Sequence, residues 1–338
     1  MAKQETKRQH FVPRVYLKYF SSENKGEYFI NALPKSSPTV DKIFQPNIKN
    51  IALERDLYTL PGDTVEERML IETFYSDNFE KHYDKMYQIL TDPKKDSITD
   101  EERKLILSTV ITMFYRTTKW INSHNELMKR VIHEMFALAK QAGTNFFMFE
   151  KEKISIEGKT EEQLLNEFKL ENRPSQVMTQ LQVALRLIDV RSERDGINVI
   201  KLNDGKDNEF ITSDNPVSYY RVGVNEIMPF DPMNVLSVPL DSKHMLMLMP
   251  YADDETKKLI FRRTDTAMMS FTQKLTANYN QWNNSEKFIF GTETGLKEYL
   301  AKKEETERPL TPEELKKAEP RQKAFDEVLK KARDMGLI

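Results

Sequence analysis

The chain has no cysteine among its 338 residues, which excludes disulfide bonds, thiolate zinc sites and cysteine nucleophiles and fits a reducing compartment. Its ten glycines form neither the G-x-G-x-x-G pattern of dinucleotide-binding sites nor the phosphate-binding P-loop pattern. The opening MAKQETKRQHF has no apolar core and is not a secretory signal. The longest apolar run, near 245–249, falls far short of the roughly 20 residues that a membrane span needs. We therefore expect a cytoplasmic protein with no membrane association.

The sequence also lacks an excess of either charge. Lys+Arg total 51 and Asp+Glu total 53, so nothing draws the whole molecule to nucleic acid, although a local basic patch can still exist. No two of its five histidines sit at metal-ligand spacing on one helix face, so we expect no zinc site. Carboxylates could still hold Mg²⁺ through oxygen ligands.

The order of hydrophobic patterns predicts an α+β fold with a helix-rich single core and a small, mostly antiparallel sheet. Thr99 and Glu102 form a capping box at the start of a long helical pattern that we expect to bend at 122–125. Helical spacing is found at 64–90, 99–142, 161–170, 174–194 and 265–282. Short β-rich segments are found at 27–33, 56–60, 198–202, 209–212, 216–222, 235–239, 244–250 and 287–290.

These patterns divide the chain into a core domain over residues 1–291 and a charged helical appendage over 292–338. Thr311, Pro312 and Glu314 predict a second capping box, which opens a helix to about residue 334. Large apolar side chains are few in that helix, so it is either a peripheral strut or a surface for a partner. The oligomeric state is not predicted.

His10 is the first candidate functional residue. It stands between a basic leader and a short helix that Pro13 can begin. Arg14 lies four residues after His10, and both could meet near the helix N-terminus, where a phosphate or carboxylate would be favoured. His10 could equally cap the helix or bind a backbone carbonyl, and the residues alone favour this structural role slightly.

The loop Thr212-Ser213-Asp214-Asn215-Pro216 is the second candidate, because it follows a predicted strand and collects polar side chains. It could present ligands, or it could simply order an Asx turn, and the two interpretations are close to even. A carboxylate at Asp214 beside the histidine would suit acid–base chemistry.

Arg116 is the third candidate, because it interrupts an apolar helix face. If buried it needs a carboxylate partner, for which Glu72 or Glu80 on the preceding helical pattern is suited. The commoner alternative is an arginine that reaches from the edge of the core to solvent. Eight residues on one helix would place the two glutamates on the same face about two turns apart.

Two motifs carry a resemblance to a known family. The segment 10–20 reads H-x-V-P-x-x-Y-L-x-x-F, and 213–216 reads S-D-x-P. Together with KNIALERDLYTL, FYRTTKW and NYNQWNNSEKFIF, they resemble a mainly bacterial domain of unknown function over about residues 8–291. The resemblance implies no reaction, but its polar positions come from five segments and imply a convergent site, which favours a functional role for His10 and Asp214. The matching positions are His10, Tyr16, Tyr58, Glu80, Arg116, Asp214, Asn215, Pro216 and Asn280.

Three functional hypotheses follow. The first is a nuclease-like hydrolase of a phosphate-containing substrate, in bacterial defence or as a toxin. In it His10 is a general acid/base, and Glu80 and Asp214 orient a base or bind Mg²⁺. Arg116 or Arg14 would hold the phosphate, while Asn215 and Asn280 would contact the substrate. The second is a non-enzymatic interaction module in which the same residues form a structural network. The third is a nucleotide or small-molecule phosphate binder.

Overall fold

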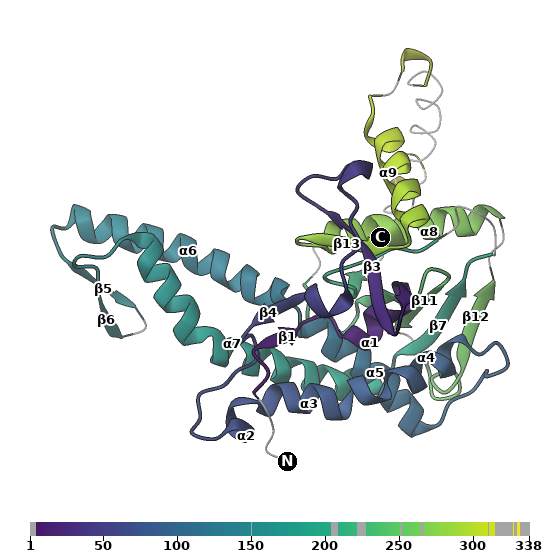
Figure 1. The fold of residues 1–338 in the computed structure, drawn as a ribbon, viewed down its shortest axis with the longest axis horizontal. Helices are drawn as coiled ribbons and strands as arrows, with labels where there is room; N and C mark the ends of the chain where they lie inside the picture. The colour runs from purple at the N-terminus through teal and green to yellow at the C-terminus, as the bar shows by residue number, and fades with distance from the viewer. Residues whose placement is uncertain are drawn as a thin grey trace.

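The computed structural model describes residues 5–149, 151–203, 209–221, 228–250, 252–264, 267–309, 311–314, 327 and 330–331, without the side chains of 267–273. The fold is α+β, as the sequence predicts (Figure 1). Its α-helices are α1 Arg14–Leu17, α2 Val65–Arg68, α3 Leu70–Asn78, α4 Tyr83–Thr91, α5 Asp100–Tyr115, α6 Thr118–Gln141, α7 Glu161–Ser192, α8 Ala267–Asn284 and α9 Glu293–Glu307. Short 3₁₀ turns are η1 Lys18–Phe20, η2 Val40–Lys42, η3 Ile48–Asn50 and η4 Glu80–His82.

The strands form two main sheets. One has the order β12-β7-β11-β10-β9, antiparallel except for the parallel pair β12–β7, and the other has the antiparallel order β2-β3-β13-β8. Two further pairs, β1–β4 and β5–β6, stand apart from these sheets. The strands are β1 Arg8–His10, β2 Ser21–Asn24, β3 Glu27–Pro34, β4 Leu53–Arg55, β5 Phe146–Phe149, β6 Glu152–Ser155, β7 Gly196–Lys201, β8 Thr212–Ser213, β9 Ser218–Tyr220, β10 Val235–Pro239, β11 His244–Met249, β12 Ile260–Thr264 and β13 Phe288–Gly291.

Helix α5 lies at the centre of the main core, packed against α7 and α4. Every residue from Ile106 to Tyr115 is buried, so this part of the helix is covered on all sides. Its buried residues Ser108 and Thr112 donate their hydroxyls to the carbonyls of Lys104 and Ser108, so these two groups are paired within the helix. The predicted capping box at its start, Thr99 with Glu102, is confirmed.

The opening segment of the chain is built into this core. Strand β1 pairs with β4, so the leader that precedes α1 is held by backbone hydrogen bonds. Pro13 stands at the N-cap of α1, which agrees with the predicted start of the helix. The Tyr16 hydroxyl, fully buried, lies 2.5 Å from Thr212 Oγ1 and donates to the Pro239 carbonyl at 2.9 Å. This segment therefore contacts strands that lie about 200 residues later in the chain.

Three predicted elements are wrong in detail. The segment 56–60 is a turn rather than a strand, because Asp56 adopts a left-handed φ of 52° directly after β4. The pattern at 64–90 is broken at Phe79, whose ring packs on Phe74 and Tyr75, so Glu72 and Glu80 do not share one helix. The pattern at 99–142 is divided at Arg116, not at 122–125.

Helix α7 is continuous where the sequence predicts a break. The sequence predicts two helices separated before Pro174, yet one helix runs through this proline. A proline inside a helix costs about 3 kcal/mol. Buried side chains on both sides of it, Leu164 and Leu165 before and Val177 and Leu181 after, fix the helix against its neighbours. Tertiary packing therefore outweighs the local cost.

The first turns of α9 pack on the β2-β3-β13-β8 sheet, where Leu296 and Tyr299 join a cluster with Leu33, Ile211 and Ile289. The proposed division of the chain at residue 291 stays a prediction. Thr311 and Glu314 exchange the hydrogen bonds of the second capping box. The helix predicted beyond it lies almost wholly outside the described residues. Among the helices that the structure describes, none is both long and apolar enough to span a bilayer.

Replacing Tyr16 with Phe tests how firmly the opening segment is joined to the sheets. The Pro239 carbonyl and the Thr212 hydroxyl would lose a buried partner, so we expect a loss of about 1–3 kcal/mol in the free energy of unfolding. Urea denaturation measures it. The control is Tyr28→Phe, whose hydroxyl binds Glu23 at an exposed position and should matter little. Equal losses in the two variants would contradict a buried anchor at Tyr16.

Candidate functional site

The candidate residues fall into two separate groups near the corner between α5 and α6. The first, here called the His10 cluster, consists of His10, Arg14, Glu72, Glu80 and Arg116. The second, here called the Asp214 cluster, consists of Lys35, Lys119, Asp214, Asn215, Asn284 and Glu286. Arg116 ends α5 and Lys119 lies in the first turn of α6, so one corner serves both groups.

Arg116 is the central member of the His10 cluster. Its side chain is only 2% exposed, and Nη1 donates to Glu80 Oε1 at 2.9 Å while Nη2 donates to the His10 carbonyl at 2.7 Å. The guanidinium carbon lies 4.4 Å from the centre of the Tyr75 ring. Burial is the largest single influence and would lower the pKa of Arg116. The Glu80 carboxylate acts against it together with Tyr58, Tyr75 and Glu72, and their sum raises the pKa above its usual value. The predicted pairing of Arg116 with Glu80 is thus present.

His10 faces the protein backbone. Its Nε2 lies 3.2 Å from the Ile48 carbonyl, which can only accept, so Nε2 carries the hydrogen and Nδ1 is the unprotonated nitrogen. Burial lowers the pKa of His10 to about 4, and the positive charge of Arg14 adds to the shift. The imidazole is therefore neutral near pH 7 and has no ionisable proton to give there. This matches the structural role that the sequence left open.

Glu72 joins the cluster without a hydrogen bond to Arg116. Burial raises the pKa of Glu72 to about 7, while the charge of Arg116 acts in the opposite direction. Its Oε2 is buried with no hydrogen-bond partner among the described residues. Arg14, which is exposed, acts electrostatically on both Glu72 and His10. The sequence named Glu72 only as an alternative partner of Arg116, and nothing in its pattern indicates a raised pKa.

Gln9 helps to fix the segment around Tyr58, and the sequence analysis did not single it out. It is fully buried; its Oε1 accepts from the Tyr58 backbone N–H at 2.5 Å, and its Nε2 donates to Thr59 Oγ1 at 3.2 Å. The Tyr58 hydroxyl in turn donates to the Arg116 carbonyl at 2.5 Å. The segment around Tyr58 therefore joins the leader to the α5–α6 corner.

Asp214 has a different set of partners from the one expected. Its carboxylate accepts three backbone N–H groups, those of Glu286 at 2.9 Å, Lys287 at 2.6 Å and Phe288 at 3.1 Å. The side chain is buried, and burial raises its pKa although these three bonds act against the shift. No hydrogen bond or electrostatic interaction in the described part of the chain joins it to His10. The expected meeting of these two residues does not occur.

Two lysines complete the Asp214 cluster by binding the end of α8. Lys119 Nζ donates to Asn284 Oδ1 at 2.5 Å, and Lys35 Nζ donates to the Ser285 carbonyl at 2.6 Å. Cations are favoured at a helix C-terminus because carbonyls there lack helical partners. Burial lowers the pKa of both lysines. The arrangement caps a helix.

Asn215 is buried beside this cap, and its carbonyl accepts from Asn284 Nδ2 at 2.6 Å. The Asn280 side chain, on α8, makes no hydrogen bond with the described residues, and its neighbours make the contacts instead. Asn278 binds the backbone of Glu209 and Ile211, and Gln281 binds Ser213. The helical spacing 278, 281, 284 is the signal that points to these amides. Within the described residues, no group of three or more His, Cys, Asp or Glu side chains could hold a metal ion.

Comparison with protein families supplies one match. The family described as "Protein of unknown function (DUF4238)" matches residues 8–295. The chain belongs to this family. The match begins at β1 and ends in the first turn of α9, so both clusters lie within it. No curated protein and no solved structure matches the chain. The match confirms that the chain contains a domain of unknown function over about the predicted range, and it adds no reaction.

Replacing Glu72 with Gln tests the raised pKa of this carboxyl. Between pH 4.5 and 7 the folded protein holds a proton here that the unfolded chain releases, so the parent loses stability as pH rises. Glutamine removes that loss. We expect the variant's free energy of unfolding, relative to the parent, to increase by up to about 3 kcal/mol across this window.

His10 acts in the opposite sense between pH 4 and 6.5, where the unfolded chain binds more protons and stability rises with pH. Subtracting the parent's curve from that of Glu72→Gln removes this background. Denaturant unfolding at several pH values gives both curves, with exposed Glu66→Gln as the control. A Glu72→Gln difference that is constant across pH 4.5–7 would show that Glu72 titrates normally.

Proposed function

We propose that the protein is a non-enzymatic interaction module, in which the two polar clusters are structural networks. The observation that carries the proposal is that Arg116 is buried and binds groups within the protein. Its guanidinium is 2% exposed and binds Glu80 and the His10 carbonyl, so it does not face solvent to receive a phosphate. A buried charge is tolerated only when it is paired and hydrogen-bonded, and these contacts supply a carboxylate and a carbonyl to the two terminal nitrogens. The Nε of Arg116 is buried without a partner among the described residues.

The Asp214 cluster supports the same proposal. A catalytic carboxylate needs a free oxygen directed at a substrate, whereas Asp214 accepts three backbone N–H groups from residues 286–288. Lys35 and Lys119 are likewise occupied at the end of α8. Lys35, Lys119 and Asp214 thus order the turn that joins α8 to β13.

Arg116→Ala and Arg116→Lys test the structural role. Alanine leaves Glu80 and the His10 carbonyl without their partner, and breaking a buried pair in this way costs about 3 kcal/mol or more. Lysine keeps the charge but cannot bind both acceptors with a planar fork, so its loss should be intermediate. Arg186→Ala, at an exposed position on α7, is the control and should change stability little. Calorimetric or denaturant unfolding ranks the three variants, and a parent-like Arg116→Ala would refute the network.

A second candidate function is a hydrolase or binder of phosphate-containing substrates, nuclease-like or nucleotide-binding. The observation that favours it is Glu72, whose pKa of about 7 suits proton transfer near neutral pH and whose Oε2 lacks a described partner. Exposed Arg14 would hold the phosphate beside it. In this version Glu72, rather than the neutral His10, carries the acid–base role.

The second candidate is tested by incubating parent, Glu72→Gln and Arg14→Ala with RNA and single-stranded DNA, with and without Mg²⁺. It expects cleavage by the parent that falls at least about tenfold in Glu72→Gln, as general acid–base catalysis requires. A parallel thermal-shift series with nucleotides detects binding without cleavage, and Arg14→Ala should abolish any shift. An inactive parent that no nucleotide stabilises leaves the interaction module as the supported function.

A further inference from the structure

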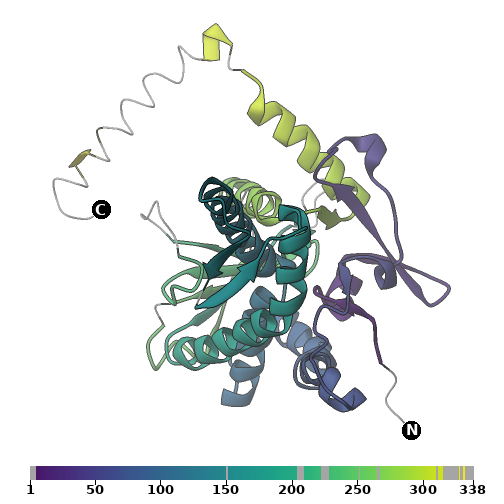
Figure 2. The same ribbon diagram turned by 90° about the vertical axis from the view of Figure 1, so that its left-hand side faces the viewer.

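An arm projects from the body of the molecule, formed by the outer half of α6, the β5–β6 hairpin and the first half of α7 (Figures 1 and 2). It has an apolar cluster of its own, separate from the main core, which consists of Ile132, Phe136, Ala139, Ile156, Leu164 and Leu165. Figure 1 shows the arm extending away from both main sheets. Neither polar cluster described above includes a residue of this arm beyond the first turn of α6.

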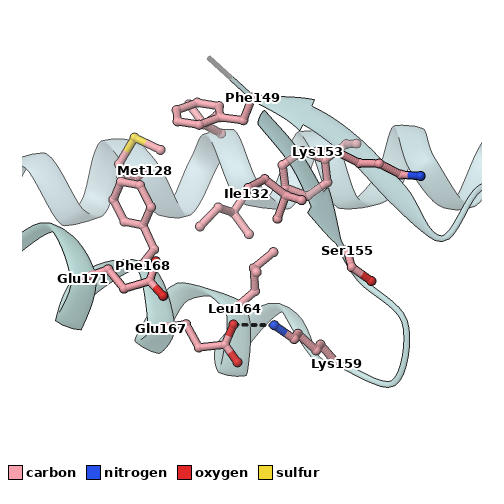
Figure 3. A pocket seen from close by; sticks show the side chains of 13 residues that line it. Met128, Ile132, Phe149, Lys153, Ser155, Lys159, Leu164, Glu167, Phe168 and Glu171 are labelled. Carbon is pink, nitrogen blue, oxygen red and sulfur yellow. Dashed lines mark hydrogen bonds and ion pairs between the residues drawn. The ribbon is translucent and has the colours of Figure 1, made fainter. Parts of the chain in front are cut away.

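A hollow of about 220 Å³ opens in the arm between the two helices and the hairpin (Figure 3). Its wall is mainly apolar and includes Met128, Ile132, Phe149, Leu164 and Phe168. An apolar cavity of about 150 Å³ is large enough to hold benzene, so this hollow can accept a large hydrocarbon side chain. Filling it would remove exposed aromatic and aliphatic surface from water.

Two exposed leucines border the hollow. Leu170 on α7 is 71% exposed and Leu127 on α6 is 58% exposed. Val131 and Glu167 line the hollow. Leu127 lies one helical turn before Val131, and Leu170 lies one helical turn after Glu167. Both leucines are exposed side chains of the kind that the hollow can accept.

The rim of the hollow carries opposite charges at its two ends. Lys153 and Lys159 lie toward one end in Figure 3, and Glu171 lies toward the other. Lys159 is already paired with Glu167 at 2.6 Å. Lys153 rests over the Phe146 ring at 4.0 Å, and no described acidic group pairs with it; Glu171 has no described cationic partner. A partner with the reversed order of charges would satisfy both.

We propose that the occupant is a second copy of this chain, bound arm to arm about a two-fold axis. A two-fold contact brings the same patch of both copies together in reversed direction. Lys153 of each copy then faces Glu171 of the other, while Leu127 and Leu170 enter the opposite hollow. Self-association explains both the opposite charges at the two ends of the hollow and the exposed leucines beside its lining residues.

This inference rests on the proposed function in that it treats the chain as one that works by association. Its test uses none of the residues of the His10 or Asp214 clusters, so the two proposals can fail separately. The substituted side chains are exposed, and unfolding curves that match the parent show that each variant is folded.

The first experiment measures the mass of the full chain in solution over a concentration series by sedimentation equilibrium. The parent is a dimer, and Leu170→Asp and Leu127→Asp are monomers at the same concentrations. The control is Leu185→Asp, on α7 outside the arm and 40% exposed, which stays dimeric. A monomeric parent overturns the proposal, as does a parent dimer that survives both arm substitutions.

The second experiment exchanges the rim charges. Lys153→Glu and Glu171→Lys each place like charges together twice per dimer, so each raises the dissociation constant about tenfold at low salt. The double variant Lys153→Glu/Glu171→Lys pairs the new charges across the axis and returns the constant to near that of the parent. A double variant as weak as, or weaker than, either single one overturns the two-fold arrangement.

Discussion

The ion pair of Arg116 with Glu80, extended to the His10 carbonyl, is the contact on which the arrangement of the N-terminal half depends. It stands where the central helix α5 ends, and it joins that end to the leader and to the 3₁₀ turn after α3. The guanidinium also covers the Tyr75 ring, which belongs to the main core. Loss of the guanidinium would leave acceptors from two distant segments unpaired. The hydrogen bonds of Arg116 therefore hold these segments in place.

The same corner organises the other half of the molecule through a different set of charges. Lys119 lies in the first turn of α6, three residues after Arg116, and it binds the C-terminus of α8. Asp214 binds the backbone that follows α8. The two clusters thus lie on either side of one corner, and their charged groups bind neighbouring groups of the protein. Such a corner makes a rigid base from which the arm can project, which suits a protein that works by contact.

Elements whose signals are local were predictable from the sequence. Thr99 and Glu102 indicate a helix start by their own hydrogen bonds. Pro13 indicates the start of α1 by its fixed backbone angle and its missing N–H. The breaks at Phe79 and Arg116 and the continuity through Pro174 were not predictable, because tertiary packing decides them. Helical periodicity alone cannot distinguish one bent helix from two.

In the candidate site too, features that depend on local chemistry were predictable, and those that depend on distant segments were not. The need of a buried Arg116 for a carboxylate is a matter of local chemistry, and the sequence correctly pointed to Glu80 as one of two partners. The partners of Asp214 lie some 70 residues later on the chain, and its placement depends on strand pairing with β13 that no local pattern encodes. The raised pKa of Glu72 arises from burial among distant segments and is likewise invisible in its spacing.

Hydrogen–deuterium exchange across β1, α1 and α5 tests the central claim most directly, because it reports whether the leader and the core open as one unit. The account predicts that amides in 8–17 of the parent are protected as strongly as those in α5, and that Arg116→Ala lowers protection in both. Leader amides that exchange rapidly in the parent while α5 stays protected would contradict it.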